Sequence, residues 1–219
     1  MLLTDAQREG LTNFISMALS RRTAASLSEL FGTSVVIEVA DIGLQPLHKL
    51  VTELDHNFAD RVAAVQQNFS GSLSGDALFI LDYQLALMLT NLLCRYTGKT
   101  PSLLDVSACE VITEIGNTIL SGYISTISNI LSNQVSFNVP SFQLTPLNSL
   151  LDNMILSHHE LRYGMLVNLN LQMCDNAINT HIILVCSVIS LSCLIKAVEP
   201  LAPMSYAATL KQTPIVSTH

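Results

Sequence analysis

Charge is the scarcest property of this chain, and its scarcity excludes several classes of protein. Only 12% of the 219 residues are charged, whereas 49% are hydrophobic. This balance is typical of a chain that buries a core and not of a disordered one. Ten basic residues stand against 17 acidic ones, the net charge is −7, and Lys and Arg form no cluster. Nucleic acids and anionic membranes both attract basic clusters, so we expect neither among the partners.

The chain also lacks a hydrophobic run long enough to cross a membrane. Its longest apolar stretch, Ile182–Ile195, has 14 residues and contains three serines, whereas a membrane helix needs about 20 apolar residues. We interpret the stretch as a buried strand that leads into a buried helix. The first ten residues, MLLTDAQREG, are acidic where a signal peptide has a basic end followed by an apolar run.

Cysteine pairs are missing as well. The five cysteines are odd in number, lie in apolar surroundings and form no C-x-x-C motif. This usage predicts reduced thiols in the core and a cytoplasmic location.

A pattern in the first half of the sequence returns 100 residues later. The capping-box patterns T-x-x-Q at Thr4 and S-x-x-E at Ser107 each start a long predicted helix. Alternating strand patterns follow both helices, VVIEV at 35–39 and VSFNV at 135–139. The repeat predicts two halves built on the same plan.

Each helix and strand is followed by a hairpin and a second helix. In the first half we expect the second hairpin strand at about 77–81 and a helix from Asp82 to Cys94. The second half has a predicted turn at Asp175-Asn176 and a helix to about Val198.

These elements predict one α+β domain with internal pseudo-twofold symmetry and a sheet packed against long helices. We expect a domain at 1–198, with repeat halves at about 4–98 and 102–198, and a C-terminal tail at 199–219. The segments 41–58 and 141–160 are interpreted as crossovers, helical in part.

The helix pattern that contains CEVITEIGNTILSG carries the candidate site. Its apolar stripe consists of Ala108, Ile112, Ile115, Ile119, Ile127 and Ile130. Glu114 and Asn117 fall on the opposite, solvent-facing stripe, one turn apart, with Cβ atoms about 5–6 Å from each other. The equivalent residues of the first half are Phe14 and Met17. Only the second half therefore combines a carboxylate with an amide.

With these residues the sequence resembles the CheC/CheX/FliY family of chemotaxis phosphatases. The signature of that family is Asp or Ser, three residues, Glu, two residues, Asn, and then 22 residues to a Pro. Glu114, Asn117 and Pro140 match these spacings. The resemblance covers about residues 4–198 and includes the glycines of the predicted first hairpin, Gly71 and Gly75.

The sequence departs from the family pattern at two places. Glu110 stands where the family has Asp or Ser. The first half has Phe14, Met17 and Ala40 in place of Glu, Asn and Pro, which implies that one of two possible sites has been lost.

The resemblance implies a hydrolase, a protein phosphatase that acts on the phosphoaspartate of a CheY-like response regulator in chemotaxis or two-component signalling. It implies two catalytic residues: Asn117 orients the attacking water, and Glu114 engages the active-site Lys of the receiver domain. An amide can both donate a hydrogen bond to water and accept one. Gly116 is expected to let the partner's surface approach. Mg²⁺ is expected on the partner receiver domain, with no cofactor or metal of the chain's own.

A non-catalytic alternative stays open at this stage. A CheC-like module could bind a receiver domain, a CheD-like deamidase or a flagellar-switch component without turnover. The joint retention of Glu114, Asn117 and Pro140 favours the enzyme. The oligomeric state is open too, and a homodimer is one of the alternatives.

Other local signals predict structure and not chemistry. The sequence SGSLSGDA lacks the Lys and the spacing of a phosphate-binding loop, so we expect hairpin glycines. His158, His159 and Glu160 have no further ligands at metal-binding spacing. Met154, Met165 and Met173 are expected to fill the core.

Overall fold

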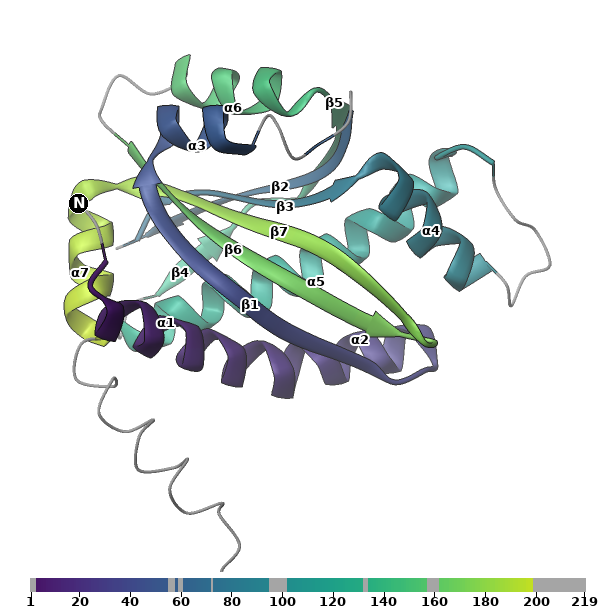
Figure 1. Cartoon of the computed structure of the whole chain (residues 1–219), viewed down its shortest axis with the longest axis horizontal. Coiled ribbons are helices and arrows are strands. Elements are labelled where there is room, and N and C mark those ends of the chain that lie inside the picture. The colour runs from purple at the N-terminus through teal and green to yellow at the C-terminus, as the bar shows by residue number, and fades with distance from the viewer. Residues whose placement is uncertain are drawn as a thin grey trace, which may run out of the picture.

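Seven antiparallel strands form a single sheet that is covered by helices on both faces (Figure 1). The computed structural model describes residues 3–54, 58, 61–71, 73–94, 102–131, 134–156 and 162–198. The elements of the first half are α1 (Asp5–Ala18), the π-helical turn η1 (Leu19–Thr23), α2 (Ala24–Phe31), β1 (Val35–Pro46), α3 (Leu47–Leu54), β2 (Val62–Gly71), β3 (Gly75–Asp82) and α4 (Tyr83–Cys94). Those of the second half are α5 (Val106–Ile130), β4 (Val135–Phe137), β5 (Ser141–Thr145), α6 (Leu147–Leu156), β6 (Arg162–Met173), β7 (Asn176–Ser187) and α7 (Val188–Val198).

The strand order reveals a pseudo-twofold axis through the middle of the sheet. The order is β1-β6-β7-β3-β2-β4, with β5 also paired to β2. This order is unchanged when it is read from the other end and the two halves are exchanged. The two hairpins pair with each other through β3 and β7. The first strand of each half pairs with the hairpin of the other half. The predicted α+β domain with pseudo-twofold symmetry is therefore confirmed. The predicted tail at 199–219 lies outside the described residues.

Helices on each face of the sheet bury one set of alternating strand side chains. On one face α3 and α6 lie side by side and cover a smaller core, which includes Leu50, Leu151, Ala64 and Ile80. The long helices α1, α2 and α5 cover a larger core on the other face. Because both faces are covered, the strand interior from Asp76 to Leu81 is buried throughout.

The long helices begin and bend at specific residues. Thr4 caps α1 through the predicted capping box with Gln7. The second helix begins earlier than predicted, because Asp105 and not Ser107 is its N-cap and accepts a hydrogen bond from the backbone N–H of Ala108 at 2.8 Å. The first long helix is continuous to Phe31 but contains the π turn η1, which the sequence pattern does not reveal.

Several strand predictions require correction. The segment 41–46 is not a crossover but a continuation of β1, and 141–145 is likewise strand β5. Within the described residues, the helical parts of the two predicted crossovers are 47–54 and 147–156. The turn after β6 is centred on Cys174 and Asp175, whose φ values are 49° and 61°, one residue before the predicted position. In the predicted strand 135–139, the regular ladder ends at Phe137, and Val139 is 89% exposed.

The apolar run and the cysteines can also be placed. Residues 182–195 are divided between β7 and α7 as predicted, and no helix within the described ranges is long and apolar enough to span a membrane. Of the four cysteines whose side chains are described, only Cys186 is buried, so the prediction of core thiols is wrong for Cys174 and Cys193, which are exposed. Met154, Met165 and Met173 are core residues as predicted.

Candidate functional site

The candidate site lies on α5, which packs directly on the sheet at Gly116. A Cβ atom at this position would come within 2.6 Å of the Cβ atom of Val65 on β2. Gly116 therefore allows close contact between helix and sheet inside the protein. The expectation that it makes room for a partner's surface is wrong, because its Cα faces the core and the residue is buried.

Glu114, two residues earlier, is exposed at the edge of a groove. The groove has a volume of about 680 Å³ and lies between the end of α2, the end of α4 and the beginning of α5. Its lining residues are Glu29, Leu30, Phe31, Gly32, Leu93, Ser107, Glu110, Val111 and Glu114. Among its described lining residues the groove thus combines three carboxylates with apolar side chains, and none of these residues is Lys or Arg. We call it the acidic groove.

Asn117 has different surroundings, because its side chain is tied to the sheet. Its Oδ1 atom accepts hydrogen bonds from Gln67 Nε2 and from Ser121 Oγ, each at 3.3 Å. Gln67 lies on β2 and is only 2% exposed. The predicted solvent-facing stripe is correct for Glu114, but Asn117 is half-buried and anchored at one end.

The segment that contains Pro140 joins the same network. Gln67 Nε2 also donates to the backbone carbonyl of Asn138 at 3.4 Å, and the N–H of Asn138 donates to the carbonyl of Asn68 at 3.0 Å. Pro140 follows in the gap between β4 and β5, where it supplies no N–H to the ladder. Gln67 therefore links Asn117 to the segment that carries the third residue of the predicted signature.

The gap at Pro140 has a counterpart in the first half. The register of β1 shifts between Val39 and Asp41, so Ala40 is an extra residue in the ladder with β6. The step from Phe137 to Ser141 likewise contains one residue more than the facing part of β2. Both halves keep the bulge, but only the second half has Pro in it, which widens the bulge into a break.

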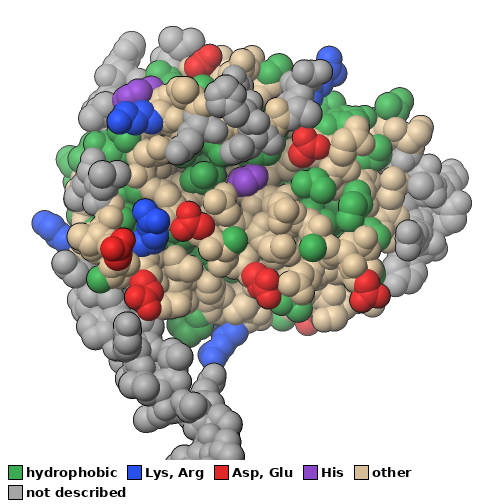
Figure 2. Space-filling view, viewed as in Figure 1, with side chains coloured by type: hydrophobic (Ala, Val, Ile, Leu, Met, Phe, Trp, Pro, Cys, Tyr) green, Lys and Arg blue, Asp and Glu red, His purple; other side chains and the backbone are tan. Residues whose placement is uncertain are grey.

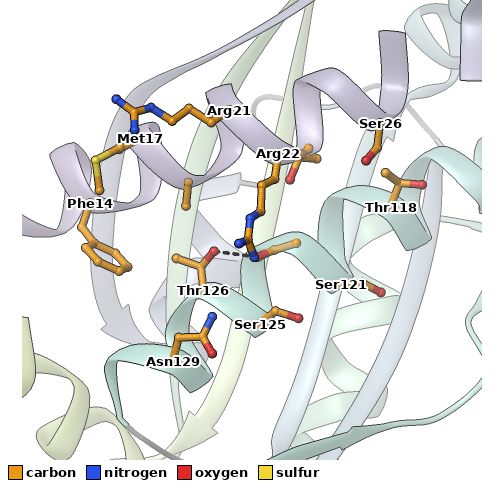
Figure 3. Close-up of a pocket in the computed structure, with 13 residues that line it drawn as sticks. Phe14, Met17, Arg21, Arg22, Ser26, Thr118, Ser121, Ser125, Thr126 and Asn129 are labelled. Carbon is orange, nitrogen blue, oxygen red and sulfur yellow. Dashed lines mark hydrogen bonds between the residues drawn. The ribbon is translucent and has the colours of Figure 1, made fainter. Parts of the chain in front are cut away.

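Phe14 and Met17 occupy the equivalent positions on α1, and they form no second site of the same kind. Phe14 is half-buried and packs against the larger core, whereas Met17 is 50% exposed. Both line a hollow of about 560 Å³ between the first long helix and α5 (Figure 3). Figure 3 shows Arg22 extending from η1 toward α5, near Thr126.

The two long helices come into contact beside this hollow. A Cβ atom on Gly122 would lie 2.3 Å from Thr23 Oγ1, so the absence of a side chain at Gly122 lets the helices touch. Thr23 is buried, and its hydroxyl has no hydrogen-bond partner among the described residues.

Sequence reasoning missed Gln67, although the repeat contains a signal for it. In the ladders with the first strands, Phe69 faces Phe137 and Leu171 faces Ile37, so β2 and β6 correspond at an offset of 102 residues. Gln67 then corresponds to Leu169. The amide pair of Asn117 and Gln67, one residue from each half, thus corresponds across the pseudo-twofold axis to Met17 and Leu169.

Two further titratable groups on α5 are poor candidates for chemistry. Burial raises the pKa of the Cys109 thiol, and the nearby Asp105 carboxylate adds to this effect, so Cys109 is not an activated nucleophile. Burial, together with Cys186, raises the pKa of Tyr123 well above its ordinary value. The described residues contain no group of three or more His, Cys, Asp or Glu side chains placed to hold a metal ion. Residues 158–160, which are predicted not to bind a metal, lie outside the described residues.

Charge on the visible face of the molecule agrees with the absence of a basic cluster in the sequence. Figure 2 shows the Lys and Arg side chains of this face scattered and not gathered into a patch.

Comparison with known proteins identifies the fold. No family model matches the sequence, and no curated protein matches it either. Among solved structures, FliY of Thermotoga maritima has a TM-score of 0.68 at 15% identity, over 93% of this chain and 99% of that chain. FliM in the FliG–FliM complex of H. pylori has a TM-score of 0.62 at 11% identity, over 89% of this chain and 100% of that chain. FliM in the FliM–SpeE complex of H. pylori has a TM-score of 0.60 at 10% identity, over 89% and 95%. The chain therefore has the fold of the CheC/CheX/FliY family, as the resemblance of its sequence predicts.

Proposed function

We propose that this protein is a phosphatase that hydrolyses the phosphoaspartate of a CheY-like receiver domain. The observation that carries the proposal is the arrangement around α5. An exposed carboxylate, Glu114, lies one turn from an amide, Asn117, which the sheet holds in place. The other half of the same fold has apolar residues at both positions.

The chemistry needs little more than positioning. In the proposed reaction a water oxygen forms a bond to phosphorus while the bond between phosphorus and the aspartyl oxygen breaks. The products are inorganic phosphate and the free carboxylate. An acyl phosphate is already reactive, so holding a water in line accounts for most of the required acceleration. Asn117 is suited to this because Gln67 and Ser121 already restrict its rotation. The receiver domain supplies the phosphoryl group and its Mg²⁺.

The acidic groove is suited to docking. Glu114 can pair with the active-site Lys of the receiver domain. Glu29 and Glu110 make the electrostatic potential around Glu114 more negative, which favours the approach of that Lys. Leu30, which is 54% exposed, offers apolar contact area at the same edge. We propose that Glu114 selects the partner and that Asn117 serves the reaction.

A second candidate function is a binding module without turnover, for a receiver domain, a CheD-like deamidase or a flagellar-switch component. The folds of the FliM chains favour it, because those chains were solved in complexes with FliG and with SpeE. Experiments must therefore measure docking and turnover separately.

The first experiment follows the loss of phosphate from a phosphorylated CheY-like receiver domain in the presence of Mg²⁺. The wild-type protein should accelerate this loss, and Asn117→Ala should lower the acceleration by about 100-fold or more, the typical cost of misplacing a reacting group by about 1 Å. Undiminished activity in a folded Asn117→Ala variant would refute the mechanism. Docking without any acceleration by the wild-type protein would favour the binding module.

The same proteins are titrated with a receiver domain that carries a stable phosphate mimic. Glu114→Gln keeps the shape of the side chain but removes its charge, and it should weaken docking by about 1–3 kcal/mol, the range for a hydrogen bond to a charged group. Glu110→Ser is the matched control in the same groove and should have little effect. If Glu110→Ser weakens docking and Glu114→Gln does not, the carboxylate role has been assigned to the wrong turn of α5.

A further inference from the structure

We propose that Gln67 fixes the Asn117 side chain so that its NH₂ group, and not its carbonyl oxygen, is presented to the ligand. The site would then bind a hydrogen-bond acceptor, such as a phosphoryl oxygen or a lone pair of water. This inference rests on the proposed function of Asn117, but the orientation of the amide can be measured on its own.

The first step concerns Gln67. Oxygen and nitrogen of a side-chain amide are assigned from their hydrogen-bond partners. Here the partner is decisive, because the end of Gln67 that faces Asn138 lies 3.4 Å from a backbone carbonyl oxygen, which can only accept. That end must be the NH₂ group. Gln67 is 2% exposed, so its amide depends on protein partners to satisfy its hydrogen bonds.

The second step carries the assignment to Asn117. The same Nε2 atom of Gln67 lies 3.3 Å from one end of the Asn117 amide, which must therefore be the oxygen. Turning Asn117 over would place two NH₂ groups against each other at this distance. Ser121 does not decide the assignment, because its hydroxyl, 3.3 Å from the same Asn117 atom and 3.5 Å from Gln67 Oε1, can donate or accept.

The third step counts the hydrogen-bonding capacity that remains. A carbonyl oxygen has two lone pairs: Gln67 donates to one, and Ser121 Oγ, whose single proton reaches Asn117 Oδ1 at 3.3 Å or Gln67 Oε1 at 3.5 Å, lies beside the other. The Nδ2 atom of Asn117 has no partner among the described residues. The expectation that this amide both donates to water and accepts from it therefore changes, since only the donor end is left for a ligand.

The repeat provides an internal comparison. Gln67 of the first half corresponds to Leu169 of the second half, and Asn117 of the second half corresponds to Met17 of the first half. The orienting amide is thus absent from the symmetry-related place at which the oriented amide is absent. This is the pattern expected if Gln67 serves Asn117 and not the general stability of the sheet.

The experiment uses three variants and the phosphorylated CheY-like receiver domain. Gln67→Glu places an acceptor opposite Asn117 and should turn the amide over, lowering turnover by about 100-fold with docking retained. Gln67→Leu copies the other half, frees the amide to rotate, and should lower turnover by about 10-fold. Gln66→Leu is the matched control, because the neighbouring Gln66 side chain bonds to Asp76 and Gln143 and not to Asn117; its turnover should be that of the wild type.

A spectroscopic measurement tests the orientation without any receiver domain. The two Nδ2 protons of Asn117 can be assigned in ¹⁵N-labelled protein by their loss in Asn117→Ala. In the wild type they should exchange freely with water, and in Gln67→Glu one of them should become protected. Protected protons in the wild type would overturn the assignment of the amide. Wild-type turnover in both Gln67→Leu and Gln67→Glu, with Asn117→Ala inactive, would overturn the positioning role. If the wild type itself shows no turnover, the proposed function fails, and the exchange data alone decide the orientation.

Discussion

At the residue scale, the consequential side chains are polar groups held in mostly apolar surroundings. Gln67 is one, and His181 on β7 is another. The His181 ring packs edge-on against Phe58, with ring centres 5.0 Å apart, and its Nδ1 atom lies 2.7 Å from Asn168 Oδ1. Burial lowers the pKa of His181 below its ordinary value of 6.5. Burial in the folded protein thus favours the neutral form of this imidazole.

This lowered pKa predicts a loss of stability in acid. In the unfolded chain His181 takes up a proton near its ordinary pKa of 6.5, whereas the folded protein resists protonation until a lower pH. The stability that neutral His181 contributes is therefore fully present above the unfolded pKa of 6.5. It is lost as the pH falls through the lower folded-state pKa. When the pH is lowered from about 7.5 to 5.5, the free energy of unfolding should fall less in His181→Leu than in the wild type. Urea unfolding at both values measures this, and equal losses in the two proteins would contradict the prediction.

At the scale of elements, the contact between α5 and β2 is determined by Gly116. Because a Cβ atom there would lie 2.6–2.9 Å from all three side-chain carbons of Val65, which is fully buried, neither side can yield easily. This contact also explains why the helix keeps a glycine in its interior, which by itself costs about 1 kcal/mol relative to alanine.

Gly116→Ala should therefore destabilise the protein despite the better helix propensity of alanine. Overpacking in a core costs about 1–3 kcal/mol, which should exceed the gain in propensity. Denaturant midpoints measure the effect, and Gly116→Ala combined with Val65→Ala should recover part of the loss relative to Val65→Ala alone. Gly43→Ala is a suitable control, because a Cβ atom there would meet nothing within 4 Å. A raised midpoint in Gly116→Ala would show that the helix has room to move.

Local signals explain which elements could be predicted from the sequence. The helices and hairpins follow from apolar periodicity and from caps such as Thr4, which act over a few residues. The N-cap at Asp105, the π turn η1 and the extension of β1 to Pro46 were missed, because tertiary contacts select among locally similar alternatives. For the site, Glu114 and Asn117 were identified by spacing. Gln67 was not, since it lies 50 residues away along the chain and reaches Asn117 only through the packing of α5 on β2.

At the scale of the whole molecule, the two halves share a fold but not a site. The pseudo-twofold axis gives each half the same helix, bulge and hairpin, yet the amides Asn117 and Gln67 correspond across the axis to the apolar Met17 and Leu169. A functional site in this fold thus depends on both a helix position and the strand position opposite it. In the candidate site the helix position, on α5, belongs to the second half and the strand position, on β2, belongs to the first half.

This dependence predicts the result of an attempt to build the symmetry-related site, which combines α1 of the first half with β6 of the second half. Phe14→Glu combined with Met17→Asn should not raise turnover per folded molecule above that of the wild type, because Leu169 offers no hydrogen bond to orient the new amide. Addition of Leu169→Gln is the informative control. A doubling of phosphatase activity by the first two changes alone would show that the strand position is dispensable.

The pairing of each first strand with the hairpin of the other half also affects how the chain folds during its synthesis. Strand β1, residues 35–46, pairs only with β6, residues 162–173, among the described strands. More than 100 further residues must therefore be synthesised before β1 can pair with β6. Until then its hydrogen-bonding edge is open to other chains, a state in which growing polypeptides aggregate. Nascent chains that end before β6 should consequently be the forms of this protein most dependent on chaperones.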